Sequence, residues 1–196
     1  MPPCPLGGSV RRVIIRDAET AEYPAVGDLR VLAYQSLGLL PEGSAYVETL
    51  RGFGFDGDCV VLVATDGAGE AGSDGANPDG AATDGVLGTI TLELFGPESE
   101  LARDETEADV RAFAVAPRAQ GRGVGRELLR AVIERAEKHG VRRLRLCTQP
   151  AMLGARHLYE TTGFTRTPDL DWSPVPGLLL RAYELALPLD QGKWTP

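Results

Sequence analysis

The sequence predicts one α/β (α+β) domain, with a mixed central sheet of about six to seven strands flanked by about four helices. Three observations favour this fold class. The chain has 196 residues, a length that suits one domain with a complete hydrophobic core. Residues 109–148 read as strand, glycine-rich loop, helix and strand, and a crossover of that length implies parallel strands. Further apolar runs of strand length precede this unit.

The first half of the chain predicts a strand, two helices and two strands, in that order. The first strand alternates Val13 and Ile15 against Ile14, whereas the second is apolar throughout. The longer helix places its apolar residues at turn spacing, and Gly52 ends the shorter one. We expect strands at residues 10–16, 59–65 and 86–94, and helices at residues 23–37 and 44–51.

The second half is dominated by one strongly amphipathic helix. One face carries apolar residues and the rest is charged, with Gly140 suited to the position after the helix end. The apolar face consists of Val124, Leu128, Leu129, Val132, Ile133 and Ala136. A further helix is expected at residues 152–162, closed by Gly163. Strands are expected at residues 109–115, 142–148 and 178–187.

Residues 66–85 interrupt this pattern and consist almost wholly of small and polar residues. Such a segment buries too little apolar surface to offset its ordering entropy, so we expect a flexible insertion in a hairpin. Its oxygen-rich side chains also allow calcium binding, although no calcium-motif spacing is present. The domain is expected over residues 10–188, with tails at residues 1–9 and 189–196.

Composition narrows the classes of partner. The net charge of −8 disfavours nucleic acid and would attract a cationic amine, although acidity for solubility explains the same value. No apolar run is long enough for a membrane span, and the first residues lack a secretion signal, so we expect a cytoplasmic protein without membrane contact. Cys4, Cys59 and Cys147 are odd in number and scattered, which predicts neither a disulfide framework nor a metal site.

The glycine-rich loop has the composition of an anion-binding site. Glycines at three alternate positions let peptide N–H groups approach a ligand, and the following helix start carries partial positive charge. Arg122 and Arg126 add full charges. A Walker loop would need Lys and Ser or Thr after Gly125, and the Rossmann glycine spacing also fails. The loop is therefore expected to suit a phosphate or a pyrophosphate, in a site that is neither a Walker loop nor a Rossmann fingerprint.

Two motifs identify a family resemblance. The segment Gln120-Gly-Arg-Gly123-Val-Gly125 resembles the pyrophosphate loop of the GNAT N-acetyltransferase superfamily. Leu158-Tyr159-Glu-Thr-Thr-Gly163-Phe164 is similar to the second signature of the same superfamily, in the right order and at a fitting distance. The resemblance covers residues 10–188, but only residues 109–164 carry specific motifs. Met152 departs from the pattern, because many members have an asparagine there that contacts the pantetheine arm.

The resemblance implies that acetyl-CoA binds as co-substrate, with no metal. The strand before the loop would expose backbone groups to the pantetheine arm, and the Val115 N–H would stabilise the oxyanion. The loop would hold the pyrophosphate through peptide N–H groups and nearby charge. The expected cofactor-binding residues are Phe113, Ala114, Val115, Gln120, Gly121, Arg122, Gly123, Val124, Gly125 and Arg126.

The resemblance also implies direct acyl transfer to an amine. Tyr159 is the expected general acid for the CoA thiolate. Asp109, on the strand before the loop, is a candidate general base, with Glu93 as its rival and Glu107 as a weaker one. Each of these carboxylates also fits a solvated position at a strand end, and some members of the superfamily need no dedicated base.

The acceptor is an open question at this level. A small-molecule amine, a protein N-terminus and a lysine all fit, and Trp172 lies in a loop that would contact the substrate. A non-catalytic acyl-CoA-binding or regulatory module of the same fold is the alternative, for which Met152 leaves room. Nucleotide binding is a remote third reading. The resemblance leaves both a monomer and a homodimer open.

Overall fold

The structure is a computed structural model that describes residues 13–41, 43–55, 57, 59–66 and 85–187. Its centre is a seven-stranded sheet in the order β1-β2-β3-β4-β5-β7-β6. The strands are β1 (Ile14–Asp17), β2 (Cys59–Thr65), β3 (Val86–Leu94), β4 (Glu107–Val115), β5 (Arg143–Thr148), β6 (Thr165–Arg166) and β7 (Arg181–Ala186). Within the sheet, β4 and β5 pair in parallel and the other neighbours are antiparallel. The mixed α/β fold expected from the sequence is thus confirmed.

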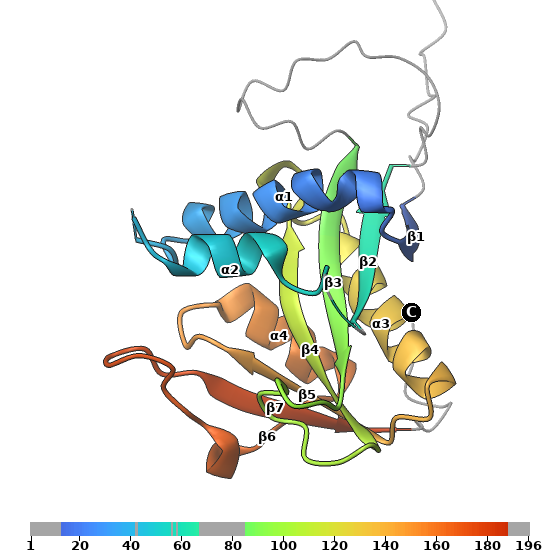
Figure 1. The fold of residues 1–196 in the computed structure, drawn as a ribbon, viewed down its shortest axis with the longest axis vertical. Helices are drawn as coiled ribbons and strands as arrows, with labels where there is room; N and C mark the ends of the chain where they lie inside the picture. The colour runs from blue at the N-terminus through green and yellow to red at the C-terminus, as the bar shows by residue number, and fades with distance from the viewer. Residues whose placement is uncertain (1–12, 42, 56, 58, 67–84, 188–196) are drawn as a thin grey trace, which may run out of the picture.

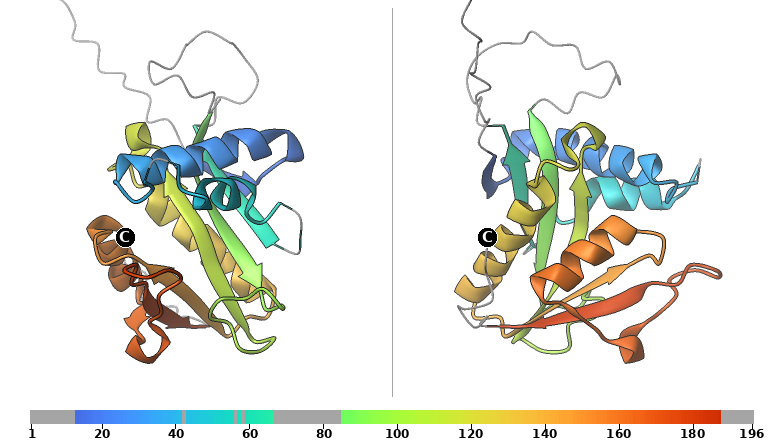
Figure 2. Two further views of the ribbon diagram at one scale, coloured as in Figure 1. Left: turned by 60° about the vertical axis from the view of Figure 1, so that its left-hand side comes forward. Right: turned by 180° about the vertical axis from the view of Figure 1, so that it is seen from behind.

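Four α-helices cover the two faces of this sheet: α1 (Tyr23–Ser36), α2 (Tyr46–Gly52), α3 (Val124–Lys138) and α4 (Leu153–Thr162). Helix α1 reaches β3 at Thr91, whereas α3 lies against Gly88 of the same strand. These two positions differ by an odd number of residues, so α1 and α3 lie on opposite faces. Figures 1 and 2 show α1 and α2 together on one side and α3 on the other.

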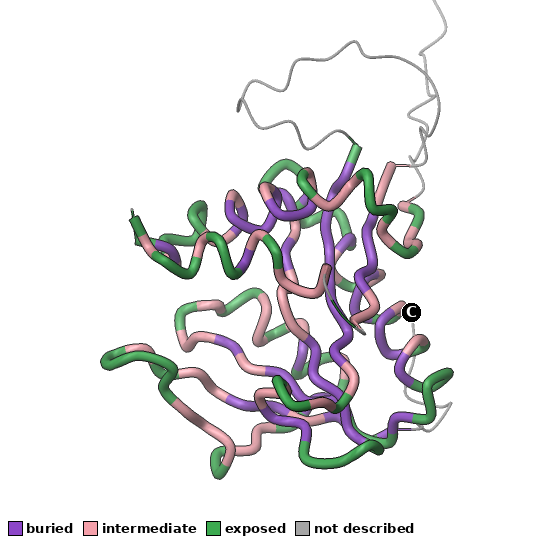
Figure 3. The backbone as a smooth tube through the Cα atoms, viewed as in Figure 1, coloured by how far each residue is buried: buried purple, intermediate pink, exposed green. Residues whose placement is uncertain are grey.

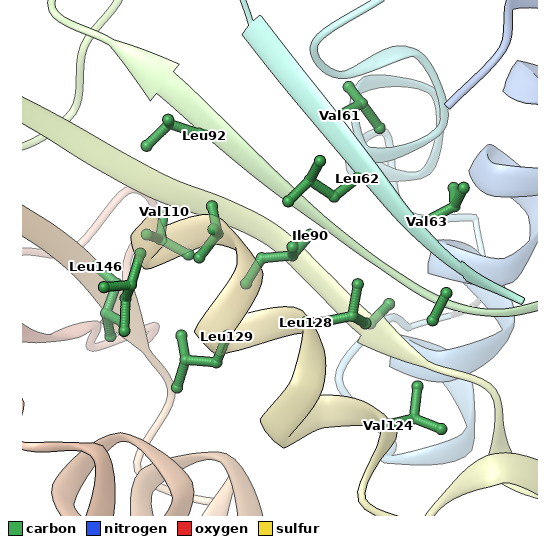
Figure 4. Close-up of a cluster of buried hydrophobic side chains, with 14 of the residues drawn as sticks. Val61, Leu62, Val63, Ile90, Leu92, Val110, Val124, Leu128, Leu129 and Leu146 are labelled. Atoms are coloured by element: carbon green, nitrogen blue, oxygen red, sulfur yellow. The ribbon is translucent and has the colours of Figure 1, made fainter. Parts of the chain in front are cut away.

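The main hydrophobic core fills the space between α3 and the sheet. Leu128 and Leu129 of α3 are almost fully buried and point towards Ile90 and Val110 on neighbouring strands (Figure 4). Figure 3 shows the same division, with buried central strands and exposed outer helix surfaces. Burying one such leucine contributes about 1.5–3 kcal/mol, so this layer fixes the position of α3 and of the loop before it.

Strand β4 leaves β5 halfway along its length. The parallel pairing runs from Glu107 opposite Arg143 to Val110 opposite Leu146, but β4 continues to Val115. A β-bulge accompanies the divergence, because two residues of β4 face one of β3 there and Ala112 has a φ of 48°. We call the region beyond the Val110–Leu146 pair, between β4 and β5, the β4–β5 split.

Element boundaries agree closely with those expected from the sequence. Strands β2 and β3 coincide with the expected ranges, and the helices differ by two residues at most. The last strand is shorter than expected, because residues 178–180 precede it as part of a loop in which Leu180 forms an isolated bridge with Trp172. Most of the expected insertion (67–84), residues 10–12 and both expected tails lie outside the described residues.

Candidate functional site

The glycine-rich loop connects β4 to α3 and presents bare backbone to solvent. Gly121 and Gly123 have φ values of 73° and 81°, a region that suits glycine, and no atom lies within 4 Å of a Cβ built on either. Gly123 is also the N-cap of α3, where no side chain caps the helix. The first N–H groups of α3 are therefore free of a capping side chain, at the positive end of the helix dipole.

The charged and polar side chains of this loop suit an anion. Arg122 and Arg126 are exposed, one in the loop and the other in the first turn of α3. Gln120 is also exposed, and its amide donates to the Val115 carbonyl at 3.4 Å. Two exposed cations beside a helix N-terminus make this the part of the site suited to a pyrophosphate.

The backbone of β4 faces the split next to this loop. The Ala116 N–H donates to the Leu87 carbonyl of β3 at 2.9 Å. Because N–H groups alternate in direction along a strand, the Val115 N–H points away from β3 and towards the split. Gly125 lies beneath, and a Cβ there would meet Phe113 at 3.3 Å and Leu158 at 3.4 Å. The loop, β4 and α4 thus converge at one place.

Tyr159 projects from α4 into this convergence. Only 4% of the residue is exposed, and its ring packs against those of Phe113, Phe164 and Tyr183 at centroid distances of 6.2, 5.9 and 6.2 Å. Burial raises the pKa of its hydroxyl, and nearby Tyr34 and Cys147 raise it further. Among the described residues, the hydroxyl has no hydrogen-bond partner. The Tyr159 hydroxyl is not one of the described polar atoms that lack both a hydrogen-bond partner and solvent exposure. The hydroxyl oxygen therefore retains some contact with solvent.

The carboxylates expected to serve as bases lie farther along the sheet. Asp109 is 1% exposed, and its two oxygens accept the N–H groups of Leu101 and Ala102 at 2.9 and 3.0 Å. Glu93 faces it across the strands and pairs with Arg111 at 3.1 Å. Burial raises the pKa of both carboxyls, against the lowering effect of these donors. The weaker candidate, Glu107, pairs with Arg145 at 2.7 Å.

The structure therefore brings some expected site residues together and leaves others apart. Phe113, Gly125 and Tyr159 converge at the split. By contrast, Asp109 and Glu93 are engaged elsewhere on the sheet, Asp109 with the N–H groups of Leu101 and Ala102 and Glu93 with Arg111.

Trp172 lies on the β5 side of the split. Its indole N–H donates to the Cys147 sulfur at 3.3 Å, and burial raises the pKa of that thiol to about 12. At the next position of β5, the Thr148 hydroxyl contacts the Met152 sulfur at 3.4 Å. A thioether thus stands where many members of the superfamily have an asparagine amide.

Sequence reasoning missed a charged group on the face of the sheet that carries Asp109. Arg111 joins Glu93 to Glu100, which lies in the connection between β3 and β4. The alternation of β4 places Arg111 on the same face as Asp109, so that residue had a detectable signal. Glu100 had none, because its position depends on how the loop folds back over the sheet.

Within the described part of the chain, no group of three or more His, Cys, Asp or Glu side chains is placed to hold a metal ion. A membrane-crossing helix is likewise absent from these residues, since none is both long and apolar enough. The site so far described is a glycine-rich loop suited to an anion, which leads into a split lined by backbone and by one buried phenol.

Comparison with known proteins identifies the family to which this site belongs. The family model described as "Acetyltransferase (GNAT) family" matches residues 46–164, which include the glycine loop, the split and Tyr159. The chain belongs to the GNAT acetyltransferase family. A search of curated protein sequences gave no significant match.

Solved structures of the same fold span nearly the whole chain. A GCN5-related N-acetyltransferase from Kribbella flavida has 24% identity and a TM-score of 0.62, covering 89% of this chain and 98% of that one. A ribosomal-protein-alanine N-acetyltransferase from Brucella melitensis has 22% identity and a TM-score of 0.59, with coverages of 89% and 99%. The protein yncA from Salmonella typhimurium, solved with its cofactor acetyl-CoA, has 19% identity and a TM-score of 0.58, with coverages of 94% and 99%. At these identities, the likeness establishes the fold.

Proposed function

We propose that the protein is an N-acetyltransferase that transfers the acetyl group of acetyl-CoA directly to an amine. The observation that carries this proposal is the continuity between the uncapped start of α3 and the β4–β5 split, where the Tyr159 hydroxyl lies without a partner. A pyrophosphate at one end and a thioester at the other would span these two features. The Salmonella typhimurium structure of the same fold, which contains acetyl-CoA, supports the same ligand.

The residues present fit this co-substrate in its two polar parts. The open space at Gly121 and Gly123 would admit the pyrophosphate, held by the peptide N–H groups of residues 120–126 and by Arg122 and Arg126. The unpaired edge of β4, from Phe113 through Ala114 to Val115, would hold the pantetheine arm by backbone hydrogen bonds. Met152 supplies no amide to this arm, so we expect the backbone to carry more of that binding.

The proposed chemistry uses two groups at the split. The Val115 N–H would stabilise the oxyanion that forms when the amine attacks the thioester carbon. Tyr159 would then give its proton to the departing thiolate. Burial raises the pKa of this phenol, and it would raise that of the thiolate as well, because both anions lose solvation in the same place. Proton transfer between them thus remains feasible. A base role for Asp109 or Glu93, and substrate contact by Trp172, stay predictions.

Titration calorimetry with acetyl-CoA tests the binding part of this proposal. In Gly123→Ala, the added methyl group would stand where the ligand meets the loop backbone, so we expect affinity to fall at least tenfold. Gly140→Ala is a matched control, because Gly140 lies at the other end of α3, has a φ of 75° and also has open space. Both variants should lose about 1 kcal/mol of stability from backbone strain. Equal affinities in the two variants would contradict the assigned loop.

Thiol release with a panel of primary amines tests the transfer part. Binding of acetyl-CoA with release on any amine supports the enzyme. Binding without release on every amine supports the non-catalytic acyl-CoA module instead, and absence of binding contradicts both functions.

A further inference from the structure

A loop residue joins β4 to β5 just before the β4–β5 split opens. Leu101 belongs to the connection between β3 and β4 and is 3% exposed. Its N–H donates to the Asp109 carboxylate of β4 at 2.9 Å, and its carbonyl accepts from the Arg145 guanidinium of β5 at 2.6 Å. One residue is thus hydrogen-bonded to both strands, and we call this arrangement the Leu101 bridge.

The Leu101 bridge lies at the pair of residues next to the split. Asp109 and Arg145 are opposite each other in the parallel pairing, and one further pair, Val110 with Leu146, ends that pairing. Side chains alternate along a strand, so this last pair points to the other face, into the core against α3 (Figure 4). The α3 core therefore holds β4 and β5 together on one face, and the Leu101 bridge holds them on the other.

The groups of the bridge are buried, so water does not compete for these hydrogen bonds. Asp109 and Arg145 both belong to the buried polar residues. The second oxygen of Asp109 accepts the Ala102 N–H at 3.0 Å, and the Arg145 guanidinium also pairs with Glu107 at 2.7 Å. Each side chain is therefore held at two points, which leaves the Leu101 peptide little freedom to shift.

The Nε atom of Arg145 indicates that the position of this side chain outweighs its local stability. Nε is buried and has no hydrogen-bond partner in the described structure. An unsatisfied buried donor is unfavourable, so such a group persists where other interactions determine its position. Here the contacts with Leu101 and Glu107 determine how the guanidinium lies.

The bridge supplements a short backbone pairing. Four residue pairs join β4 to β5 in the described sheet, and β4 then continues to Val115 without β5. On the side of β3, the bulge at Ala112 accompanies the divergence of β4. On the side of β5, the Leu101 bridge is the side-chain contact nearest to the point of divergence on its face of the sheet.

We propose that the Leu101 bridge fixes the opening of the β4–β5 split, and that Arg145 and Asp109 are positioning residues for the pantetheine arm of acetyl-CoA. This inference rests on the proposed acetyltransferase function, in which that arm lies along the free edge of β4. With the bridge intact, this edge is held at a fixed distance from β5 before the ligand arrives. Binding then requires no ordering of the two strands, which favours affinity.

The test compares two ligands by titration calorimetry without an acceptor amine. Acetyl-CoA would span the glycine-rich loop and the split, whereas its nucleotide part, 3′-phospho-ADP, has the pyrophosphate but no pantetheine arm. In Arg145→Lys the charge beside Glu107 is kept, but an ammonium lacks the planar fork that reaches Glu107 and the Leu101 carbonyl together. We expect the dissociation constant of acetyl-CoA to rise about tenfold and that of 3′-phospho-ADP to stay unchanged.

Arg143→Lys is the matched control. Arg143 lies on the same face of β5 but one pair farther from the split, and its side chain is 45% exposed. Its ion pairs with Glu107 and Glu184 are long, at 3.8 and 3.7 Å, so we expect wild-type affinity for both ligands. A general loss of stability in Arg145→Lys would weaken both ligands alike, whereas loss of positioning weakens acetyl-CoA alone.

Asp109→Asn breaks the same bridge from β4 and serves if Arg145→Lys does not fold. Asparagine keeps the shape of the side chain, but its terminal nitrogen cannot accept an N–H, so either Leu101 or Ala102 loses its partner. Acetyl-CoA affinity should again fall selectively. The double variant should lose little more than each single variant, because both substitutions disrupt one bridge.

Two results would overturn the assignment while the wild type still binds acetyl-CoA. They are unchanged acetyl-CoA affinity in Arg145→Lys and Asp109→Asn, and an equal loss for the two ligands. Binding of neither ligand by the wild type would instead refute the proposed function. Amide exchange then still tests the bridge itself, because the paired amides of β4 and β5 should exchange about tenfold faster in Arg145→Lys than in Arg143→Lys. Equal exchange rates would contradict the bridge.

Discussion

Tyr159 is the residue on which the proposed chemistry depends most directly. Its ring is held by three aromatic neighbours, whereas its hydroxyl has no partner in the described structure. The ring therefore fixes the position of Tyr159, whereas the hydroxyl is the group that could take part in the reaction. The ring packing belongs to the fold, and the hydroxyl is free to serve a substrate.

Removal of that hydroxyl tests this separation. In Tyr159→Phe the aromatic packing is kept and no protein hydrogen bond is lost, so the melting temperature should change little. If the phenol protonates the thiolate, kcat should fall by about 10²-fold while the dissociation constant of acetyl-CoA stays within a few-fold. Stopped-assay thiol release and calorimetry on the same preparation measure both. An unchanged kcat would remove the acid role.

At the scale of elements, the position of the glycine-rich loop depends on how α3 lies on the sheet. Gly88 of β3 provides the contact, because a Cβ there would meet Leu128 at 2.9 Å, the Ala114 carbonyl at 3.0 Å and Val124 at 3.2 Å. Helix and strand approach closely because that side chain is absent. The start of α3 is thereby held against the end of β4.

Substitution of Gly88 by alanine should therefore displace α3. We expect Gly88→Ala to lower the free energy of unfolding by about 1–3 kcal/mol, since two buried side chains and a carbonyl must move. Denaturant unfolding followed by circular dichroism measures this loss. Gly154→Ala is a suitable control, because nothing lies within 4 Å of a Cβ at that glycine of α4. Similar losses in both variants would mean that the close contact between α3 and β3 does not depend on the missing side chain at Gly88.

The accuracy of the sequence-based elements follows from the strength of local patterns. Helix α3 and the apolar strand β2 were predicted closely, because periodicity over many residues determines both. Strand β6 has two residues and offers no such pattern. The bulge at Ala112 was not foreseen, since an alanine gives no sign of a positive φ and the conformation arises from the diverging strands. Glu100 was missed because distant residues, Asp109 and Arg111, define its place.

On the scale of the whole molecule, acidic side chains gather near the loop that connects β3 to β4. The chain has a net charge of −8, and three of its carboxylates lie on one face of the sheet beneath or within this loop. Burial raises the pKa values of all three, Glu93, Glu100 and Asp109, despite their hydrogen-bond donors. The fold thus favours their protonated forms more than the unfolded chain does.

This arrangement predicts the direction of one pH effect on stability. The pKa of Glu93 is raised above 4.5 in the fold, so its contribution is fully present below that pH and is lost as pH rises through the folded value. The unfolding free energy of wild type relative to Glu93→Gln should therefore fall between pH 4 and pH 7. Urea unfolding of both proteins at several pH values measures the difference. A difference that grows with pH would contradict the assigned shift.

The short seam between β4 and β5 has a mechanical consequence. Four residue pairs, from Glu107–Arg143 to Val110–Leu146, are the backbone link in the described sheet between β1–β4 and β5–β7. The sheet thus consists of two halves joined along one short edge. A ligand bound along the rest of that edge would contact both halves. A seated ligand should make the two halves melt as one cooperative unit and slow amide exchange on both sides of the seam.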